Sequence, residues 1–325
     1  MVDLALMARL AMALAPTARL VLLGDRDQLA SVEAGAVLGD VCGDAPGFSG
    51  TFRARVEGVL GRALPAARSV SSPLTDSIVL LRESHRFGGA SGIGRLASAV
   101  NVGDAAAAVA LLQDEDHPDV CAADGGGADL ARMVVAGYAT YHERVGAGAD
   151  PAALFEALGE FRVLCAHRRG PQGARALNAI MDGERAARDV WYPGRPVLIT
   201  ENDYALRLFN GDVGIALADP EAGGELRVFF EGDARRMRRL SPARLPPHET
   251  TYAMTIHKSQ GSEFGRVLLV LPPEDSRLLT RELLYTGITR AREAVTIWGS
   301  TLVLGAGIER GLARSSGLRD ALWVA

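Results

Sequence analysis

The segment Thr255-Ile256-His257-Lys258-Ser259-Gln260-Gly261-Ser262-Glu263-Phe264 carries the strongest signal of fold and chemistry in the chain. Its hydroxyl, imidazole and ammonium groups follow an expected strand, and such a mixture is suited to hold phosphate oxygens along a single nucleic-acid strand. Gly261 allows the backbone to approach a ligand closely, and Glu263 offers an acceptor for a ribose hydroxyl. The alternative interpretation is a polar surface loop with a glycine bulge.

Lys258 is the only lysine in the sequence. A Walker A loop, which cradles nucleotide phosphates, requires a glycine before its lysine, whereas Lys258 follows His257. The sequence therefore contains no Walker A motif. His257 has no partners at metal-ligand spacing, so we predict no metal site in this chain.

The composition is that of a globular protein, because 48% of the 325 residues are hydrophobic, enough for two or three domains. The net charge of −4 provides no general attraction for nucleic acid, so any contact with DNA requires a local basic groove. The three cysteines form no Cys-x-x-Cys pair, which argues against a disulfide framework or a zinc site and favours a reducing cytoplasm. The apolar N-terminal stretch contains Arg9 and stops at Pro16, which predicts a core helix, and no apolar run is long enough to span a membrane.

The first 75 residues are expected to form part of an α/β domain. Asp3 can cap a helix over Leu4 to Leu14, and the apolar run from Leu20 to Leu23 predicts a buried strand. That strand would deliver Gly24 and Asp25 to the carboxyl end of a parallel sheet, where the ligands of such sheets bind. Residues 43–75 are rich in glycine, serine, proline and arginine, which predicts irregular structure that closes the domain.

A second α/β domain is expected over residues 76–190 and 250–325. It begins with a strand at residues 78–81, and a second strand is expected from Phe161 to Cys165. A helix between them stops near Gly103 and has on one face Ile93, Leu96, Ala97 and Val100.

The intervening residues 191–249 have a different pattern, with short apolar runs separated by turn signals. Strands are predicted at residues 196–200, 206–209, 213–218 and 226–230. This spacing is typical of a small β-barrel, inserted here into the second α/β domain.

Gln28 follows the first expected strand, within the stretch from Gly24 to Gly35. A neutral amide at this place can hydrogen-bond both a nucleotide phosphate and an attacking water, so Gln28 is predicted to sense the nucleotide. An ordinary polar turn between strand and helix is the alternative.

Arg86 follows a strand in Arg82-Glu83-Ser84-His85-Arg86-Phe87, and it could project into a cleft as a phosphate clamp. Taken alone, an arginine at such a place is better interpreted as a solvated charge or a surface ion pair. The cluster Arg235-Arg236-Met237-Arg238-Arg239 is equally open, since it suits either a DNA backbone or a soluble rim.

Arg290 lies in the stretch from Glu282 to Arg292, which predicts a helix with an apolar inner face. From that helix the guanidinium would point outward from a rigid element. A guanidinium suits the charge of a γ-phosphate because its planar fork stays ionised. The alternative is a solvated helix arginine.

Taken in order, the segments around Gln28, Arg86, Lys258 and Arg290 resemble helicase motifs III, IV, V and VI of the RecD family in superfamily 1, the exodeoxyribonuclease V alpha subunits. Sequence similar to RecD also occurs at residues 162–171, 202–204 and 208–212. The resemblance therefore covers most of the chain.

The resemblance implies an ATP-dependent 5′-to-3′ DNA translocase with two RecA-like domains and an SH3-like β-barrel inserted in the second. Residues 1–75 would be the remainder of the first RecA-like domain, residues 76–190 and 250–325 the second, and residues 191–249 the barrel. The catalytic residues would be Gln28, Arg86 and Arg290. The implied nucleotide-binding residues are Gly24, Asp25, Gln28, Arg86, Gly261, Glu263 and Arg290. The implied DNA-binding residues are Thr255, His257, Lys258, Ser259 and Gln260.

The implied partners are single-stranded and duplex-end DNA together with RecB-like and RecC-like subunits, although a stand-alone helicase remains an alternative. The implied cofactors are ATP and Mg²⁺. Met1-Val2-Asp3-Leu4 is similar to the residues that directly follow the Walker B motif of the family, so the magnesium ligands would lie outside this sequence.

We therefore expect the C-terminal motor half of a helicase of double-strand break repair and recombination, which hydrolyses ATP only when a Walker A and B half is supplied. The isolated chain is predicted to be inactive. The alternative is a catalytically inactive DNA-binding or assembly subunit from a truncated helicase gene. An unrelated α/β enzyme is disfavoured, since the sequence shows no nucleophile paired with a base and no metal constellation.

Overall fold

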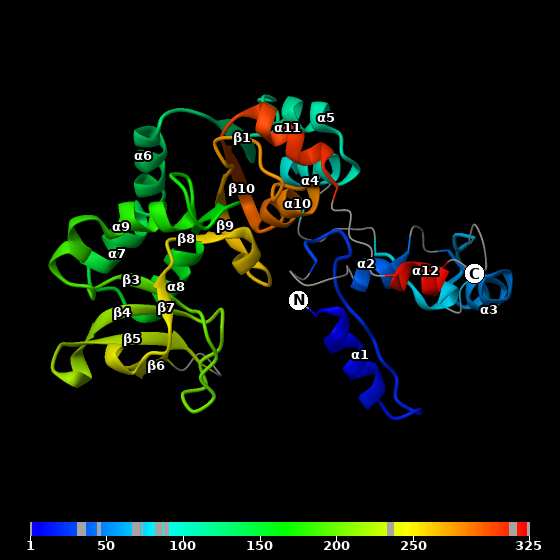
Figure 1. The fold of residues 1–325 in the computed structure, drawn as a ribbon, viewed down its shortest axis with the longest axis horizontal. Coiled ribbons are helices and arrows are strands. Elements are labelled where there is room, and N and C mark those ends of the chain that lie inside the picture. The colour runs from blue at the N-terminus through cyan, green and yellow to red at the C-terminus, as the bar shows by residue number, and fades with distance from the viewer. Residues whose placement is uncertain are drawn as a thin grey trace. The chain divides into compact units, whose positions relative to one another are not determined.

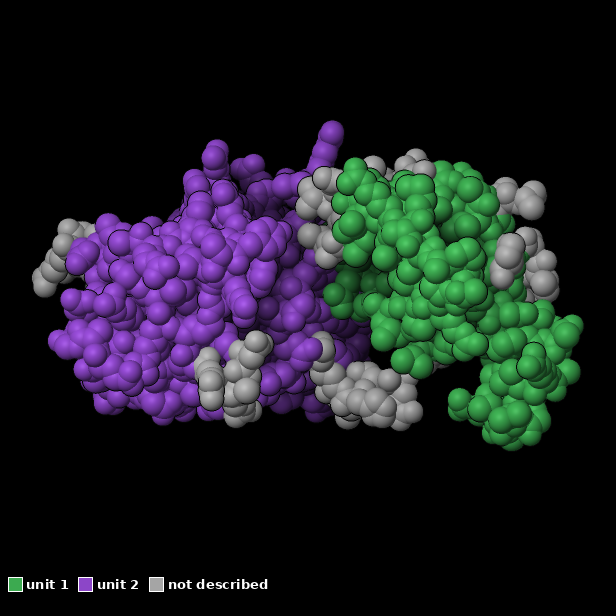
Figure 2. Space-filling model, turned by 90° about the horizontal axis from the view of Figure 1, so that it is seen from below, with its two compact units in different colours: residues 1–86, 311–325 green, residues 87–310 purple. Residues whose placement is uncertain are grey.

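The computed structural model describes residues 2–30, 37–43, 47–66, 72, 74–81, 87, 91–232, 237–311 and 317–323, with the side chains of residues 184–188 excepted. The chain divides into two compact units (Figures 1 and 2). The first unit comprises residues 1–86 and 311–325, and the second comprises residues 87–310. The domain boundaries expected from the sequence remain predictions.

The described part of the first unit is helical and contains no strand. Its elements are α1 (Leu4–Ala13), α2 (Val37–Cys42), α3 (Gly50–Leu60), η1 (Thr75–Ser77) and α12 (Leu318–Trp323). The indole Nε1 of Trp323 donates to the carbonyl of Asp40 at 2.9 Å, which fixes α12 against α2 within this unit.

Asp3 caps α1 as predicted, because its carboxylate accepts the amide hydrogen of Leu6 at 2.7 Å. The expectation of a core helix is wrong, since none of the residues of α1 is buried. Residues 43–75 are also more regular than expected. Ser49 accepts from the amide of Phe52 and starts α3, and Gly61 ends it in the left-handed conformation, with a φ of 65°.

The two apolar runs of the first unit were predicted to be strands, and this prediction is wrong. Residues 20–23 and 78–81 form no strand, and Leu23 and Leu81 are 90% and 86% exposed. An apolar run becomes a strand when neighbouring strands pair with its backbone. The described part of this unit offers no such neighbour.

The second unit contains a five-stranded parallel sheet in the order β1-β10-β9-β2-β8. The strands are β1 (Val120–Ala123), β2 (Phe161–Cys165), β8 (Ala253–Thr255), β9 (Phe264–Val270) and β10 (Ala291–Trp298). The accompanying helices are α4 (Gly92–Val102), α5 (Ala105–Leu111), α6 (Gly127–Gly137), α7 (Ala139–Gly146), α8 (Pro151–Gly159), α9 (Ala174–Arg188), η5 (Ile256–Ser259), α10 (Arg281–Ile288) and α11 (Thr301–Glu309).

Helices cover both faces of this sheet. Leu268 and Val270 of β9 join the core that α6, α8 and α9 form against β2. Leu269 lies between them in sequence and so faces the other side, where it approaches Gly287 of α10 so closely that an added Cβ would lie 2.7 Å from its side chain. The predicted parallel α/β organisation is confirmed here, including the buried strand from Phe161 to Cys165.

The predicted helix face in α4 is also confirmed. Its four expected inward residues are buried, with exposures of at most 5%: Ile93, Leu96, Ala97 and Val100. Gly103 ends the helix with a φ of 81°, as its position in the sequence indicates.

The antiparallel sheet of the second unit lies within the segment expected to be inserted, and its strand order is β6-β5-β4-β3-β7. Its elements are β3 (Arg195–Ile199), β4 (Val213–Asp219), η2 (Pro220–Ala222), β5 (Glu225–Glu231), β6 (Met237–Leu240), η4 (Pro242–Arg244) and β7 (His248–Thr250). The prediction of a strand at residues 206–209 is wrong. These residues form a turn closed by a bridge between Asp203 and Leu208.

Tyrosine hydroxyls and an asparagine join the antiparallel sheet to the parallel one. Tyr141 and Tyr252 both donate to the carbonyl of Gly194, at 2.9 and 3.0 Å, just before β3 begins. Asn178 of α9 donates to the carbonyls of Thr250 and Ala253 at 2.7 and 2.8 Å, and it accepts from the amide of Ala253 at 2.7 Å. The segment between β7 and β8 is therefore fixed to α9.

Candidate functional site

The segment that follows β8 begins the candidate site. β8 ends at Thr255, and η5 follows at once, so the polar side chains lie at the carboxyl end of a parallel strand. Thr255 and Lys258 line a pocket of about 280 Å³. Ser259 does not, because its side chain is fully buried and donates to the carbonyl of Ile256 at 2.8 Å. His257 and Gln260 are half-buried beside them.

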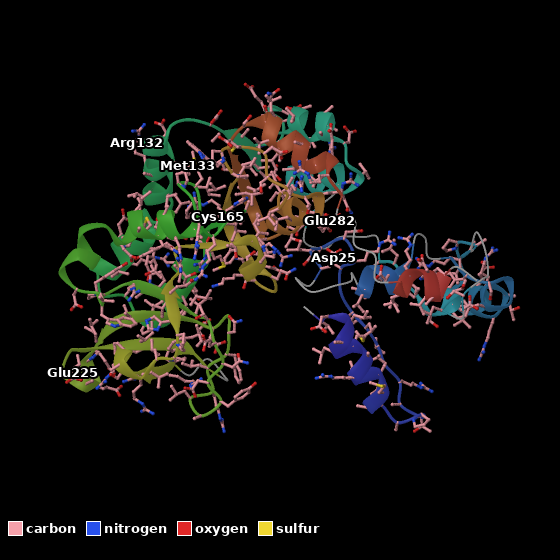
Figure 3. All side chains as sticks on the ribbon, in the orientation of Figure 1. Asp25, Arg132, Met133, Cys165, Glu225 and Glu282 are labelled. Atoms are coloured by element: carbon pink, nitrogen blue, oxygen red, sulfur yellow. The ribbon has the colours of Figure 1, made fainter. Side chains whose placement is uncertain are left out.

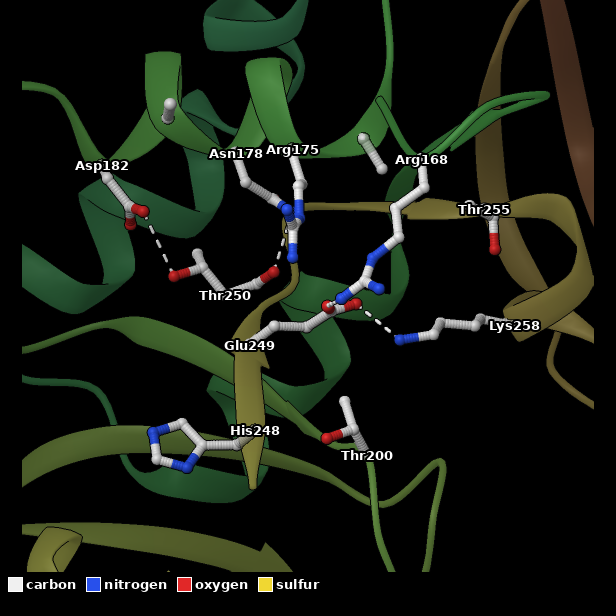
Figure 4. Close-up of a pocket in the computed structure, with 12 residues that line it drawn as sticks. Arg168, Arg175, Asn178, Asp182, Thr200, His248, Glu249, Thr250, Thr255 and Lys258 are labelled. Atoms are coloured by element: carbon white, nitrogen blue, oxygen red, sulfur yellow. Dashed lines mark hydrogen bonds and ion pairs between the residues drawn. The ribbon is translucent and has the colours of Figure 1, made fainter. Parts of the chain in front are cut away.

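The pocket lies between the two sheets of the second unit, and Figure 4 shows its side chains converging from both. One wall comes from the loop after β2 and from α9, and the other from β7, β8 and η5. The lining residues are Arg168, Ala174, Arg175, Asn178, Ala179, Asp182, Thr200, His248, Glu249, Thr250, Thr255 and Lys258.

Glu249 lies between two cations in this pocket. Its Oε1 is 2.6 Å from Nζ of Lys258, and its Oε2 is 2.9 Å from Nη2 of Arg168 (Figure 4). Burial alone would raise the pKa of Glu249, but the hydrogen bonds and charges of Lys258 and Arg168 outweigh it and lower the pKa. The carboxylate is therefore ionised at neutral pH.

The other carboxylate of the pocket is held by hydroxyl groups. Asp182 accepts from the hydroxyl of Tyr192 at 2.6 Å and from that of Thr250 at 3.2 Å. Arg175 is exposed and makes no ion pair within the described part of the chain. The guanidinium of Arg175 therefore has no ion-pair partner among the described residues, whereas Arg168 and Lys258 share the carboxylate of Glu249.

Arg290 does not lie on the predicted helix, because α10 ends at Ile288 and β10 begins at Ala291. The side chain is 4% exposed, and its guanidinium donates to the carbonyls of Thr286 and Ser262 at 3.0 and 3.1 Å. The structure thus brings Arg290 against the segment that contains Gly261 and Glu263. Gly261 has a φ of 83°, and both Gly261 and Glu263 are exposed.

Gln28 belongs to the first unit and lies in a turn with Asp25. Its amide donates to Oδ2 of Asp25 at 3.0 Å, while Oδ1 of the same carboxylate accepts from the backbone of Asp27 at 3.0 Å. Gly24 precedes them, and an added Cβ would lie 2.8 Å from the side chain of Leu38. The side-chain amide of Gln28, which was predicted to sense the nucleotide, is therefore hydrogen-bonded within the turn that contains it.

Three arginines singled out in the sequence, Arg86, Arg235 and Arg236, lie outside the described residues. The other two members of the arginine cluster bind within the antiparallel sheet. Arg238 donates to the carbonyl of Arg207 at 2.8 Å, and Arg239 pairs with Asp219 and Glu221. For these two side chains the structure favours a role in the sheet.

Sequence reasoning did not single out Glu249, and it did not assign Arg168 or Arg175 to a site. Arg168 lies in the segment that resembles RecD, which was the only available signal. Among the residues described, no cluster of histidine, cysteine or acidic side chains could hold a metal ion. No helix in this part of the chain is long and apolar enough to cross a membrane.

Two family models match segments of the chain. The UvrD-like helicase C-terminal domain matches residues 250–298, which include η5 and Arg290, and an AAA domain matches residues 1–49. The helicase match spans β8, η5, β9, α10 and β10 of the parallel domain.

Among curated proteins, the chain is similar to RecD subunits. The chain is 42% identical to the RecBCD enzyme subunit RecD of Mycolicibacterium smegmatis and 44% identical to that of Mycobacterium tuberculosis, in each case over 99% of this chain and 52% of the relative. The chain is thus similar to RecD subunits over almost its whole length, which confirms the resemblance. It spans about half the length of these curated relatives.

Other relatives are more distant. The ATP-dependent RecD2 DNA helicase of Deinococcus radiodurans is 37% identical over 44% of this chain and 20% of that protein. The solved Pif1 helicase from Candida albicans is 13% identical, with a TM-score of 0.37 over 79% of this chain and 64% of that one.

Proposed function

We propose that this chain is the C-terminal motor half of an ATP-dependent DNA helicase of the RecD type, which translocates 5′ to 3′ on single-stranded DNA in double-strand break repair and recombination. The observation that supports this best is the basic pocket beside η5. It contains Lys258 and Thr255 of the segment that the helicase domain model matches. Phosphate oxygens are the groups that lysine, arginine and threonine side chains bind in sequence-independent DNA contacts.

ATP is the proposed cofactor, and each residue assigned to it is a separate proposal. The amide of Gln28 and the guanidinium of Arg290 are donors for a γ-phosphate, and the carboxylate of Glu263 is an acceptor for a ribose hydroxyl. Arg86, Gly24, Asp25 and Gly261 complete the proposed nucleotide-binding set. Bound ATP would supply the free energy of hydrolysis that moves the protein along DNA.

The groups that hold Mg²⁺ and the β-phosphate are proposed to belong to a Walker A and B half. The sequence has no Walker A motif, and the described residues contain no carboxylate cluster for a metal. We therefore propose that a polypeptide of these 325 residues requires a Walker A and B half for ATP hydrolysis.

The second candidate is a catalytically inactive DNA-binding or assembly subunit. DNA binding and assembly do not require a Walker A motif. The proposed partners are single-stranded and duplex-end DNA with RecB-like and RecC-like subunits, in the cytoplasm. A stand-alone helicase is the alternative that the similarity to RecD2 keeps open.

The antiparallel sheet of residues 195–250 is proposed to be an SH3-like barrel that guides DNA. One set of its side chains forms a separate cluster, with Val197, Ile199, Leu208, Ala216, Val228 and Phe230 packed together, whereas Ile215 of β4 joins the core of the parallel domain. The sheet interrupts the parallel domain between β2 and β8, as an inserted domain does.

ATP hydrolysis tests the proposed function. The purified 325-residue polypeptide is expected to show no ATPase activity stimulated by single-stranded DNA. Co-expression with the N-terminal half of the RecD subunit of Mycobacterium tuberculosis is expected to yield a complex that hydrolyses ATP in a DNA-dependent manner. Turnover by the polypeptide alone contradicts the need for a second half. A stable complex that binds DNA but never hydrolyses ATP favours the inactive subunit.

A further inference from the structure

The pocket between the two sheets has the geometry of an anion site. The ammonium of Lys258 and the guanidinium of Arg168 come from different elements, η5 and the loop after β2, and both meet the carboxylate of Glu249 (Figure 4). Side-chain exposures are 29% for Lys258, 27% for Glu249 and 51% for Arg168, so a ligand in solvent can reach the group.

The anion between Lys258 and Arg168 in this structure is the carboxylate of Glu249. Glu249 is on β7 of the antiparallel sheet, whereas both cations belong to the parallel domain. A phosphodiester resembles this carboxylate, because it carries one negative charge on two outward oxygens that accept hydrogen bonds. It can therefore replace Glu249 between the same two cations.

Neighbouring groups favour such an exchange. Arg175 lines the pocket and makes no ion pair within the described part of the chain, so it can contact the incoming phosphate or an adjacent one. Asp182 is engaged by two hydroxyl donors and does not compete for the cations.

We propose that this pocket binds a phosphate group of the single-stranded DNA backbone through Arg168, Arg175 and Lys258, and that Glu249 occupies the phosphate position when DNA is absent. The proposal rests on the proposed function, since it specifies where the DNA backbone lies. Glu249 acts as a competing anion: DNA binding breaks its ion pairs and frees β7 from η5 and from the loop after β2.

The test compares the intact 325-residue chain with single substitutions, using a fluorescent 15-residue oligothymidylate as the probe. Glu249→Gln is expected to lower the Kd about fivefold at low salt, because it removes the competing charge and keeps the shape of the side chain. Arg168→Ala and Lys258→Ala are expected to raise the Kd about fivefold. Each should also reduce the slope of log K against log salt by about 0.7, the value for one lost phosphate contact on a single strand.

Glu225→Gln is the matched control. Glu225 is 69% exposed and pairs with Arg227 at 2.8 Å, so its substitution changes the net charge equally and also releases an arginine. Figure 3 places it at the outer part of the antiparallel sheet, and it does not line the pocket. Its Kd should stay within about twofold of that of the parent. Circular dichroism and a cooperative melt confirm the fold of each variant. If Glu249→Gln does not fold, Glu249→Asp takes its place, and a smaller gain in affinity for the oligonucleotide is expected.

Each outcome decides the proposal. Tighter binding by Glu249→Gln than by Glu225→Gln, with weaker binding by the two cation variants, supports it. Equal affinities of the two glutamine variants overturn it and leave the proposed function intact, provided that the parent binds the oligonucleotide. If no variant binds, both proposals fail. Sodium phosphate should displace the DNA no better than sodium chloride of equal ionic strength, and stronger displacement would assign the pocket to a free anion instead.

Discussion

Nζ of Lys258 lies 2.6 Å from Oε1 of Glu249, and this contact joins the two sheets of the second unit. Lys258 follows β8 of the parallel sheet, while Glu249 is on β7 at the edge of the antiparallel one. Lys258, the only lysine of the chain, belongs to the parallel domain but is held by an ion pair with the inserted antiparallel sheet. Any motion of the antiparallel sheet relative to β8 would change the distance between Lys258 and Glu249.

Arg290 is predicted to act on the γ-phosphate in an enzyme completed with a Walker A and B half. Arg290→Ala should lower kcat for ATP by about 10³ to 10⁵, the usual contribution of an arginine finger. Arg290→Lys should restore little, since an ammonium lacks the planar fork. Steady-state ATPase measurements at saturating single-stranded DNA provide the readout, and Arg86→Ala should behave like Arg290→Ala.

Arg277→Ala is the control for that series, because Arg277 is an exposed arginine of the same unit. The guanidinium of Arg290 also donates to the carbonyls of Thr286 and Ser262, so a melt must show that the variant still folds. Parent-like turnover by a folded Arg290→Ala enzyme would show that the assigned role is wrong.

Asn178 is predicted to stabilise the second unit more than an ordinary surface amide. Asn178→Ala leaves two buried carbonyls and one amide, at Thr250 and Ala253, without their side-chain partner. We expect the free energy of unfolding to fall by about 2 to 3 kcal/mol. Urea unfolding followed by circular dichroism measures it, with the exposed Asn210→Ala as a control expected to stay within about 0.5 kcal/mol of the parent. Equal effects of the two substitutions would contradict the assigned contacts.

Tyr138 is predicted to make the second unit sensitive to alkali. Burial raises the pKa of Tyr138 from 10.0 to about 12. Above pH 10 the unfolded chain therefore loses this proton while the folded chain keeps it. The stability that Tyr138 contributes is fully present below pH 10 and is lost as the pH rises through about 12.

Tyr138→Phe separates this effect from other alkaline effects. The variant loses the hydrogen bond to the carbonyl of Tyr252, which costs about 1 kcal/mol at neutral pH. Between pH 10 and 12 it should lose less stability than the parent, by up to roughly 3 kcal/mol. Urea unfolding at a series of pH values tests this against Tyr204→Phe, since Tyr204 is 76% exposed. Parallel pH profiles for the parent and Tyr138→Phe would refute the assignment.

The sequence predicted the strand at residues 161–165, which pairs with neighbours on both sides within the described chain. Residues 161–165 and 20–23 look alike as apolar runs, yet only the former are a strand, since β2 pairs with both β8 and β9. Hydrophobic pattern reports the tendency of a segment to be buried, whereas a strand also needs neighbours for its backbone. The run that ends at Leu23 is apolar, but no described strand of its unit pairs with its backbone, and Leu23 is exposed.

The candidate site was predicted only where residues are adjacent in sequence. Thr255 and Lys258 were recognised from their own segment, and both line the pocket. Glu249 could not be recognised, because its role depends on the close approach of β7 to η5 and to the loop that carries Arg168. Arg290 was placed on a helix because apolar spacing continues past Ile288, where the chain instead turns into β10.

Amine footprinting of Lys258 tests whether DNA binds in this pocket. The 325-residue polypeptide has a single lysine, and its α-amino group serves as an internal reference. The chain is treated with sulfo-N-hydroxysuccinimidyl acetate with and without single-stranded oligothymidylate, and mass spectrometry quantifies acetylation at both amines. At a DNA concentration about ten times the Kd, the rate at Lys258 should fall about tenfold while the rate at the α-amino group is unchanged. An unchanged rate at Lys258 under conditions where the DNA is bound would contradict the account.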